Sequence, residues 1–169
     1  ISAQFQHAIY FPHLANVRNP RLLKSLISYL KQHPQVEVYE NTWIEKFNIQ
    51  NQKIQSVESA NGQHFVADQF VIATGAWSNC WADQLQLSIP VEPVQGQMML
   101  FKTPENWLPT MCMNNVMYLI PRLDGHIVCG SSMDHIGFDK RPNVQTQQNI
   151  YKACIEMVPE LANFPIVKQ

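Results

Sequence analysis

The sequence lacks the features that mark several common classes of protein. Its 169 residues include 12 lysines and arginines against 13 aspartates and glutamates, so no excess charge is available to hold nucleic acid or an anionic membrane. No apolar run is long enough for a membrane-spanning helix, and the first residues show no basic-then-apolar signal pattern. With 46% hydrophobic residues the chain is globular. We expect a cytoplasmic protein without a nucleic-acid partner or a membrane span.

Paired cysteines are also missing. The four cysteines are irregularly spaced, without a CxxC pair or a Cys/His knuckle: Cys80, Cys112, Cys129 and Cys154. A structural zinc site needs such spacing, so we expect none and interpret the cysteines as free thiols in a reducing compartment. His126, Asp134 and His135 lie close in sequence but show no metal-ligand spacing.

Glycine is scarce, and the six glycines form no GxGxxG motif. That loop is the usual cradle for the pyrophosphate of a dinucleotide, so the chain by itself lacks the usual means of binding one. Either no dinucleotide is bound, or the motif lies upstream of Ile1.

Regular patterns of apolar and polar residues are present and predict a mixed α/β fold. Helical spacing predicts helices over residues 19–33, 77–87 and 143–158, the first with Asn19 as N-cap and Pro20 in its first turn. β-Branched and aromatic runs predict strands over residues 7–11, 36–39, 43–49, 54–59, 64–66, 70–73, 91–101, 117–122, 126–132 and 164–169.

The segment FVIATGAWS (residues 70–78) is the most suggestive one. Its FVIA run does not alternate, which suits a strand buried on both faces of a parallel sheet. The small residues Ala73, Thr74 and Gly75 follow, and such a corner lets a nucleotide cofactor lie against the backbone. Gly75 equally suits a tight strand-to-helix turn without any ligand, and both interpretations stay open at this point.

Five segments, taken in order, are similar to the flavin-dependent amino-acid oxidase family, and most of all to its glycine oxidase branch linked to thiamine biosynthesis. They are VRNPRLLKSL (17–26), FVIATGAWS (70–78), PVEPVQGQMM (90–99), YLIPRLDGHIVCGSSMDHIGFDK (118–140) and MVPEL (157–161). Each is modest alone, but the order and spacing are specific.

The resemblance implies an α+β or α/β architecture, with part of a FAD-binding Rossmann-like domain interleaved with a mostly antiparallel substrate-binding sheet and flanking helices. We expect residues 1–16 to supply a strand of the substrate domain, and 17–89 to form the partial FAD domain. Residues 90–141 would form the substrate sheet, and 142–169 a helix that returns towards the FAD domain. Members carry GxGxxG near their N-terminus, so the chain resembles an internal piece of an oxidase.

The resemblance also implies roles for single residues. Ile44 matches a position whose backbone contacts adenine, and Ala73, Thr74, Gly75 and Trp77 match the cofactor-side turn. Two of these have plain structural alternatives, because a strand residue such as Ile44 and an isolated tryptophan such as Trp77 commonly serve the core.

On the substrate side, Tyr118 matches a tyrosine that faces the flavin and hydrogen-bonds the substrate carboxylate. Met133 matches a methionine that lines the pocket. The alternatives are a core or interface tyrosine and a methionine that fills the core. No residue of the chain is assigned as catalytic.

The implied activity is oxidation of a small amino acid or amine. A hydride passes from the substrate α-carbon to non-covalently bound FAD, the resulting imine hydrolyses, and oxygen accepts the electrons. Two alternatives remain: a FAD-dependent dehydrogenase that uses another acceptor, and a non-catalytic module. A homo-oligomer is compatible with the sequence. We expect the 169-residue chain alone to be inactive and free of FAD.

Overall fold

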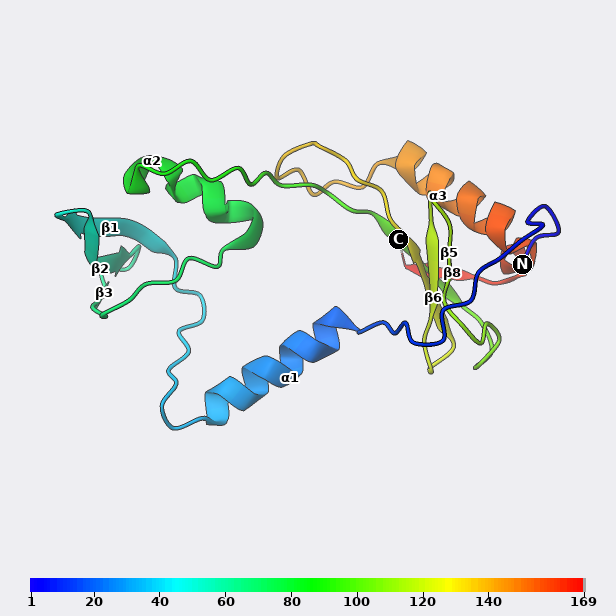
Figure 1. Cartoon of the computed structure of the whole chain (residues 1–169), viewed down its shortest axis with the longest axis horizontal. Helices are drawn as coiled ribbons and strands as arrows, with labels where there is room; N and C mark the ends of the chain where they lie inside the picture. Colours follow the sequence, from blue (N-terminus) through cyan, green and yellow to red (C-terminus); the bar gives the residue numbers. More distant parts are fainter. Residues whose placement is uncertain (169) are drawn as a thin grey trace. The chain divides into compact units, whose positions relative to one another are not determined.

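The computed structural model describes residues 1–168, which form two compact units (Figure 1). The meander unit comprises Ala15–Glu92, and the sheet unit comprises Ile1–Leu14 together with the chain from Pro93 onward. The chain thus leaves the sheet unit once and returns to it. Within residues 1–168, no helix is both long and apolar enough to cross a membrane.

The meander unit begins with helix α1, Asn19–Gln32, which confirms the first predicted helix. Its N-cap is Arg18 and not Asn19, because Arg18 is the residue with an extended backbone (φ −82°, ψ 90°) and Asn19 is already helical. Pro20 lies in the first turn, where its missing N–H is harmless. The helix ends just before His33 and Pro34, since a residue before proline avoids the helical region.

A three-stranded antiparallel meander follows. Its strands are β1 (Ile44–Gln50), β2 (Lys53–Ser59) and β3 (His64–Phe65), in the order β1-β2-β3. The first turn places Asn51 and Gln52 at φ 50° and 59°, as a two-residue hairpin loop requires. Gly62, at φ 82°, serves the second turn. The predicted strands 43–49, 54–59 and 64–66 are confirmed to within one or two residues at each end.

Three predicted strands are wrong. Residues 7–11, 36–39 and 70–73 run without regular secondary structure. A strand needs a neighbouring edge to satisfy its backbone groups, and in the described part of the chain no strand pairs with these segments. Val71 is accordingly 88% exposed, although FVIA was predicted to be buried on both faces. A 3₁₀ helix, η1 (Gly75–Trp81), and helix α2 (Ala82–Leu85) then form the predicted short helical segment.

The sheet unit contains a five-stranded antiparallel sheet in the order β5-β6-β7-β4-β8. Its strands are β4 (Met98–Lys102), β5 (Cys112–Met113), β6 (Tyr118–Pro121), β7 (His126–Gly130) and β8 (Ile166–Lys168). The strands predicted over 117–122 and 126–132 are confirmed as β6 and β7, which form a hairpin with Gly125 at φ 74° in its turn. The strand predicted over 91–101 is shorter, because β7 ends at Gly130 and only Gln95 bridges further, to Asp134.

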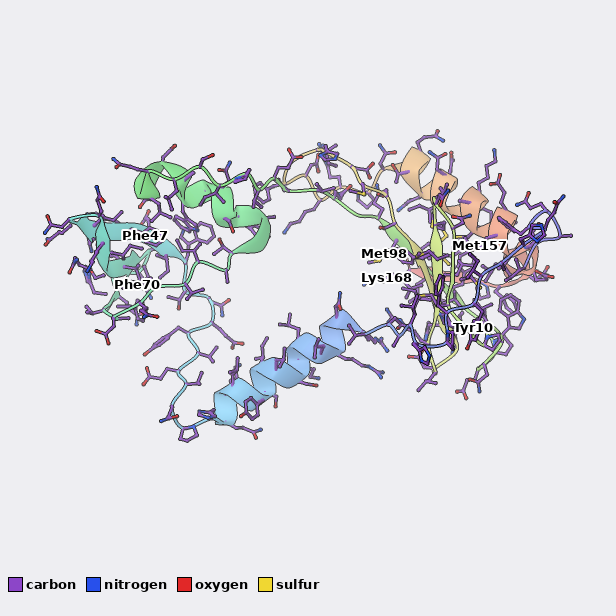
Figure 2. The ribbon with its side chains drawn as sticks, viewed as in Figure 1. Tyr10, Phe47, Phe70, Met98, Met157 and Lys168 are labelled. Carbon is purple, nitrogen blue, oxygen red and sulfur yellow. The ribbon has the colours of Figure 1, made fainter. Side chains whose placement is uncertain are left out.

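Side-chain alternation gives this sheet two unlike faces. One face carries the fully buried residues Phe101, Leu119 and Cys129, which pack against helix α3, Val144–Met157 (Figure 1). The other face, here called the open face, carries the residues that alternate with these along each strand. Met98, which is half-exposed, lies on it; Figure 2 labels Met98, and also Met157 of helix α3. The core therefore lies between the sheet and α3.

Helix α3 is fixed at both ends. The helix predicted over 143–158 is confirmed, and its N-cap is Asn143, whose Oδ1 accepts from the backbone N–H of Thr146 at 3.1 Å. At its C-terminal end, the N–H of Ser2 donates to the carbonyl of Met157 at 2.8 Å, and the Gln4 side chain donates to a neighbouring carbonyl. A 3₁₀ turn, η2 (Pro159–Asn163), then leads into β8.

Candidate functional site

The small-residue corner of the meander unit is open and accessible. Ala73, Thr74 and Gly75 are exposed, and Gly75 adopts φ 54°. A Cβ placed on Gly75 would have no heavy atom within 4 Å. The corner is held by the N–H of Trp77 donating to the Thr74 carbonyl at 3.0 Å, and by the Thr74 hydroxyl donating to Ser78 Oγ at 3.2 Å. An uncovered backbone of small residues fits the approach of a nucleotide cofactor.

Trp81 fixes this corner relative to the meander. It is buried, and its ring packs on those of Trp43 (centroids 5.6 Å apart) and Phe47 (5.2 Å, edge-on). The Gln84 amide continues the contact, because it accepts from the N–H of Phe47 at 3.2 Å and donates to the Glu45 carbonyl at 3.1 Å. Its side chain thus satisfies backbone groups of β1 as a neighbouring strand would.

The other two predicted cofactor residues belong to the same unit. Ile44 is half-buried and is the first residue of β1, directly after Trp43. Ile44 therefore lies next to the residue whose ring contacts Trp81. Trp77 is 43% exposed, which places it outside the core that the alternative interpretation gave it. The anchor of this helical segment is Trp81 instead, four residues later.

On the open face of the sheet unit, Tyr118 shares one cross-strand row with Gly130 and Met98. Tyr118 pairs with Gly130, and Gly130 pairs with Met98 on its other side. The Tyr118 hydroxyl donates to Met98 Sδ at 3.5 Å. A thioether is a weak acceptor, so this hydroxyl remains an available donor for a stronger one, such as a carboxylate.

The next row along the same face is apolar. Ile120, Val128 and Leu100 are paired across β6, β7 and β4 in the same way. Ile120 and Leu100 are half-buried. The Tyr118 row and this row together form a largely apolar surface, with the Tyr118 hydroxyl on one row and Lys168, the partner of Leu100 on β8, at the end of the other. Such a surface suits a small ligand that carries one charged group.

Met133 lies beyond β7 on a loop, and it is 74% exposed. The loop is tied down by its neighbours, not by Met133 itself. Asp134 accepts at Oδ2 from the Ser132 hydroxyl at 2.7 Å and from the amide of buried Gln97 at 3.2 Å. Ser132 Oγ in turn accepts from the backbone N–H of Gln97 at 3.0 Å.

Gln97 links this polar group to helix α3. Its Oε1 accepts from the backbone N–H of Asn143, the N-cap residue, at 3.0 Å. One buried side chain therefore connects the approach to β4, the loop of Met133 and the start of α3. We call Gln97, Ser132 and Asp134 the loop-anchoring group.

The structure places the predicted site residues in two groups. Ile44, the 73–75 corner and Trp77 belong to the meander unit, whereas Tyr118 and Met133 belong to the sheet unit. Sequence reasoning missed Gly130, Met98 and the loop-anchoring group. The available signal was Gly130 itself, since a glycine inside a strand marks a close approach of another group.

The sheet core holds buried thiols, and the described residues hold no candidate metal centre. Among residues 1–168, no three His, Cys, Asp or Glu side chains gather closely enough to hold a metal ion. Cys129 and Cys154 are fully buried between β7 and α3. A hydrogen bond between the two thiols, with burial, raises the pKa of Cys129 and keeps it protonated.

Comparison with solved structures identifies the fold class. Glycine oxidase from Geobacillus kaustophilus superposes with a TM-score of 0.71 at 24% identity, over 79% of this chain and 36% of that chain. L-Proline dehydrogenase from P. horikoshii gives 0.68 at 22% identity. The chain therefore has a FAD-dependent oxidase fold, as the mixed α/β prediction anticipated.

The sequence comparisons identify the family. The family model described as "DAO: FAD dependent oxidoreductase" matches residues 2–168, and the chain belongs to this family. Glycine oxidase from Pseudomonas putida is 42% identical over 163 residues, which are 96% of this chain and 44% of that protein. The bifunctional protein ThiO/ThiG from Trichormus variabilis is 28% identical over 93% of this chain and 24% of that protein. The chain thus spans less than half the length of these relatives.

Proposed function

We propose that the chain is part of a FAD-dependent oxidase that acts on a small amino acid or amine, similar to glycine oxidase. The main support is the Tyr118 row on the open sheet face, taken together with the 42% identity to the Pseudomonas putida glycine oxidase. A rigid aromatic wall with one uncommitted hydroxyl suits a substrate that is small, carries a carboxylate and has little side chain.

The meander unit would hold the adenosine side of FAD without a covalent bond. The exposed corner at Ala73, Thr74 and Gly75 gives the backbone access that such a ligand needs, and the Trp81 contacts fix that corner. Ile44 and Trp77 would complete the contacts on this side. When bound, FAD supplies the acceptor for the hydride that leaves the substrate α-carbon.

The sheet unit would orient the substrate. The Tyr118 hydroxyl would donate to the substrate carboxylate, and Met133 would supply part of an apolar wall. No side chain of the chain is given the role of a strong base, because an amine that binds in its neutral form needs none. The imine product then hydrolyses, and oxygen accepts the electrons.

The proposal extends to the cellular compartment and to the properties of the isolated chain. Four free cysteines suit a reducing compartment, so we place the protein in the cytoplasm. The 169-residue chain spans 44% of its Pseudomonas putida relative, and we expect it alone to be colourless and inactive. A visible flavin spectrum from the purified chain would contradict this expectation.

Oxygen consumption by the full-length, flavin-loaded protein to which this chain belongs, with glycine and other small amines as substrates, tests the activity. Oxidase activity predicts oxygen uptake and hydrogen peroxide in step with substrate loss. Reduction of an artificial dye without oxygen uptake would instead favour a dehydrogenase, the activity named for the 28% identical D-amino acid dehydrogenase of Granulibacter bethesdensis. Failure of every small amine to reduce the flavin would contradict both.

A further inference from the structure

Gly130 occupies the centre of the row that contains Tyr118 and Met98. The glycine has no side chain, so the two flanking side chains meet across it, and the Tyr118 hydroxyl reaches Met98 Sδ at 3.5 Å. The phenol ring of Tyr118 thus covers the β7 backbone at Gly130. Any other residue at position 130 would cover that backbone with its own side chain.

The space above Gly130 is already filled. A Cβ placed there would lie 2.8 Å from Met98 Cγ, 3.0 Å from Tyr118 Oη and 3.3 Å from Tyr118 Cζ. These distances are shorter than the 3.5–4.0 Å at which non-bonded carbon atoms attract best. Gly130 is not among the glycines with positive φ, so its conformation does not call for glycine. Glycine is required at position 130 because the neighbouring side chains, in these positions, leave no room for a Cβ.

From this geometry we propose that Gly130 is a positioning residue for Tyr118. It lets the phenol ring lie across β7 and so determines where the hydroxyl stands on the open face. This inference rests on the proposed function, in which that hydroxyl meets the substrate carboxylate. The tyrosine determines what is bound, and the glycine determines where the tyrosine's polar tip is presented.

The two flanking side chains would respond differently to a larger residue at position 130. Met98 is 50% exposed and flexible, so it can move into solvent at little cost. The phenol ring of Tyr118 is rigid and must move as a whole, carrying its hydroxyl with it. Gly130→Ala and the larger Gly130→Val therefore leave the sheet folded and displace the hydroxyl to increasing extents.

Aromatic and methionine-methyl NMR on the 169-residue chain tests the ring position without any activity. The Tyr118 ring signals should shift in Gly130→Ala and further in Gly130→Val, because the ring moves. The Met98 methyl signal should shift as well, since the new Cβ also displaces Met98. The Met99 signal should hold still, since Met99 is buried on the opposite face. Gly96→Ala is the matched control, because a Cβ there meets its nearest atom at an ordinary 3.5 Å. Unmoved Tyr118 ring signals in Gly130→Val overturn the proposal.

Binding of acetate to the full-length, flavin-loaded protein, followed by the flavin spectrum, tests the functional consequence. A hydrogen bond to a charged group contributes enough that Tyr118→Phe should weaken acetate binding about tenfold. Gly130→Val should weaken it comparably, and the double variant should bind no more weakly than either single variant.

The outcomes distinguish the positioning role of Gly130 from the substrate-binding role of Tyr118. If the two losses multiply in the double variant, Gly130 acts independently of Tyr118 and the positioning role is overturned. If Tyr118→Phe leaves acetate binding unchanged while the Tyr118 ring signals still move in Gly130→Val, the substrate role of Tyr118 fails and the positioning role stands.

Discussion

Removing the Asp134 carboxylate should destabilise the sheet unit by about 2 kcal/mol. Its Oδ2 accepts two hydrogen bonds, from the Ser132 hydroxyl at 2.7 Å and from the Gln97 amide at 3.2 Å. A hydrogen bond to a charged group contributes about 1.5–3 kcal/mol net. Ser132 is only half-buried, so in Asp134→Ala its hydroxyl finds water, whereas the Gln97 amide is buried and loses its partner. The Gln97 term therefore dominates the estimate.

Urea denaturation measures this change in the free energy of unfolding, provided the slope with urea stays the same. Asp134→Asn is the matched control, because it keeps the shape and one acceptor oxygen but not the charge, and it should lose about half as much. Hydrogen exchange should also quicken at residues 131–136, since the loop that carries Met133 loses its anchor. A loss below about 0.5 kcal/mol in Asp134→Ala, the range of ordinary surface substitutions, would refute the loop-anchoring group.

Three further outcomes are expected. Gly125→Ala should cost at least about 2 kcal/mol in urea denaturation, because Gly125 has φ 74° and a Cβ there would lie 2.5 Å from the Thr103 carbonyl oxygen. Hydrogen bonds from Arg141 lower the pKa of Asp139 to about 2, so Arg141→Gln should return that pKa towards its ordinary 3.8 in a carboxyl NMR titration. A thiol reagent at neutral pH should modify Cys80, the exposed cysteine, in the folded chain and all four cysteines after denaturation; rapid labelling of a second thiol would contradict the burial of the others.

Local signals predicted most of the regular elements that the structure contains. The turns at Asn51 and Gly62 and the hairpin turn at Gly125 all act within a few residues of their own position. A turn that needs positive φ is visible in a short stretch of sequence. These are the places where the predicted and observed boundaries agree.

Segments whose state depends on distant partners were predicted less well. The apolar run at 70–73 has strand composition, but composition alone supplies no neighbouring edge, and the segment is irregular. The candidate site shows the same division. Tyr118 was named from its motif, whereas its neighbours Gly130 and Met98 follow from strand register across β6, β7 and β4. No short stretch of sequence displays that register.

The hydrogen bond from Gln4 to the carbonyl of Glu156 joins positions 152 residues apart. A ribosome adds about 5–20 residues per second, so roughly eight to thirty seconds pass between the synthesis of the two partners. During that interval the whole of Ala15–Glu92 is synthesised and free to fold. Residues 1–14 therefore stay without their hydrogen bonds to the end of α3 until that helix has been synthesised.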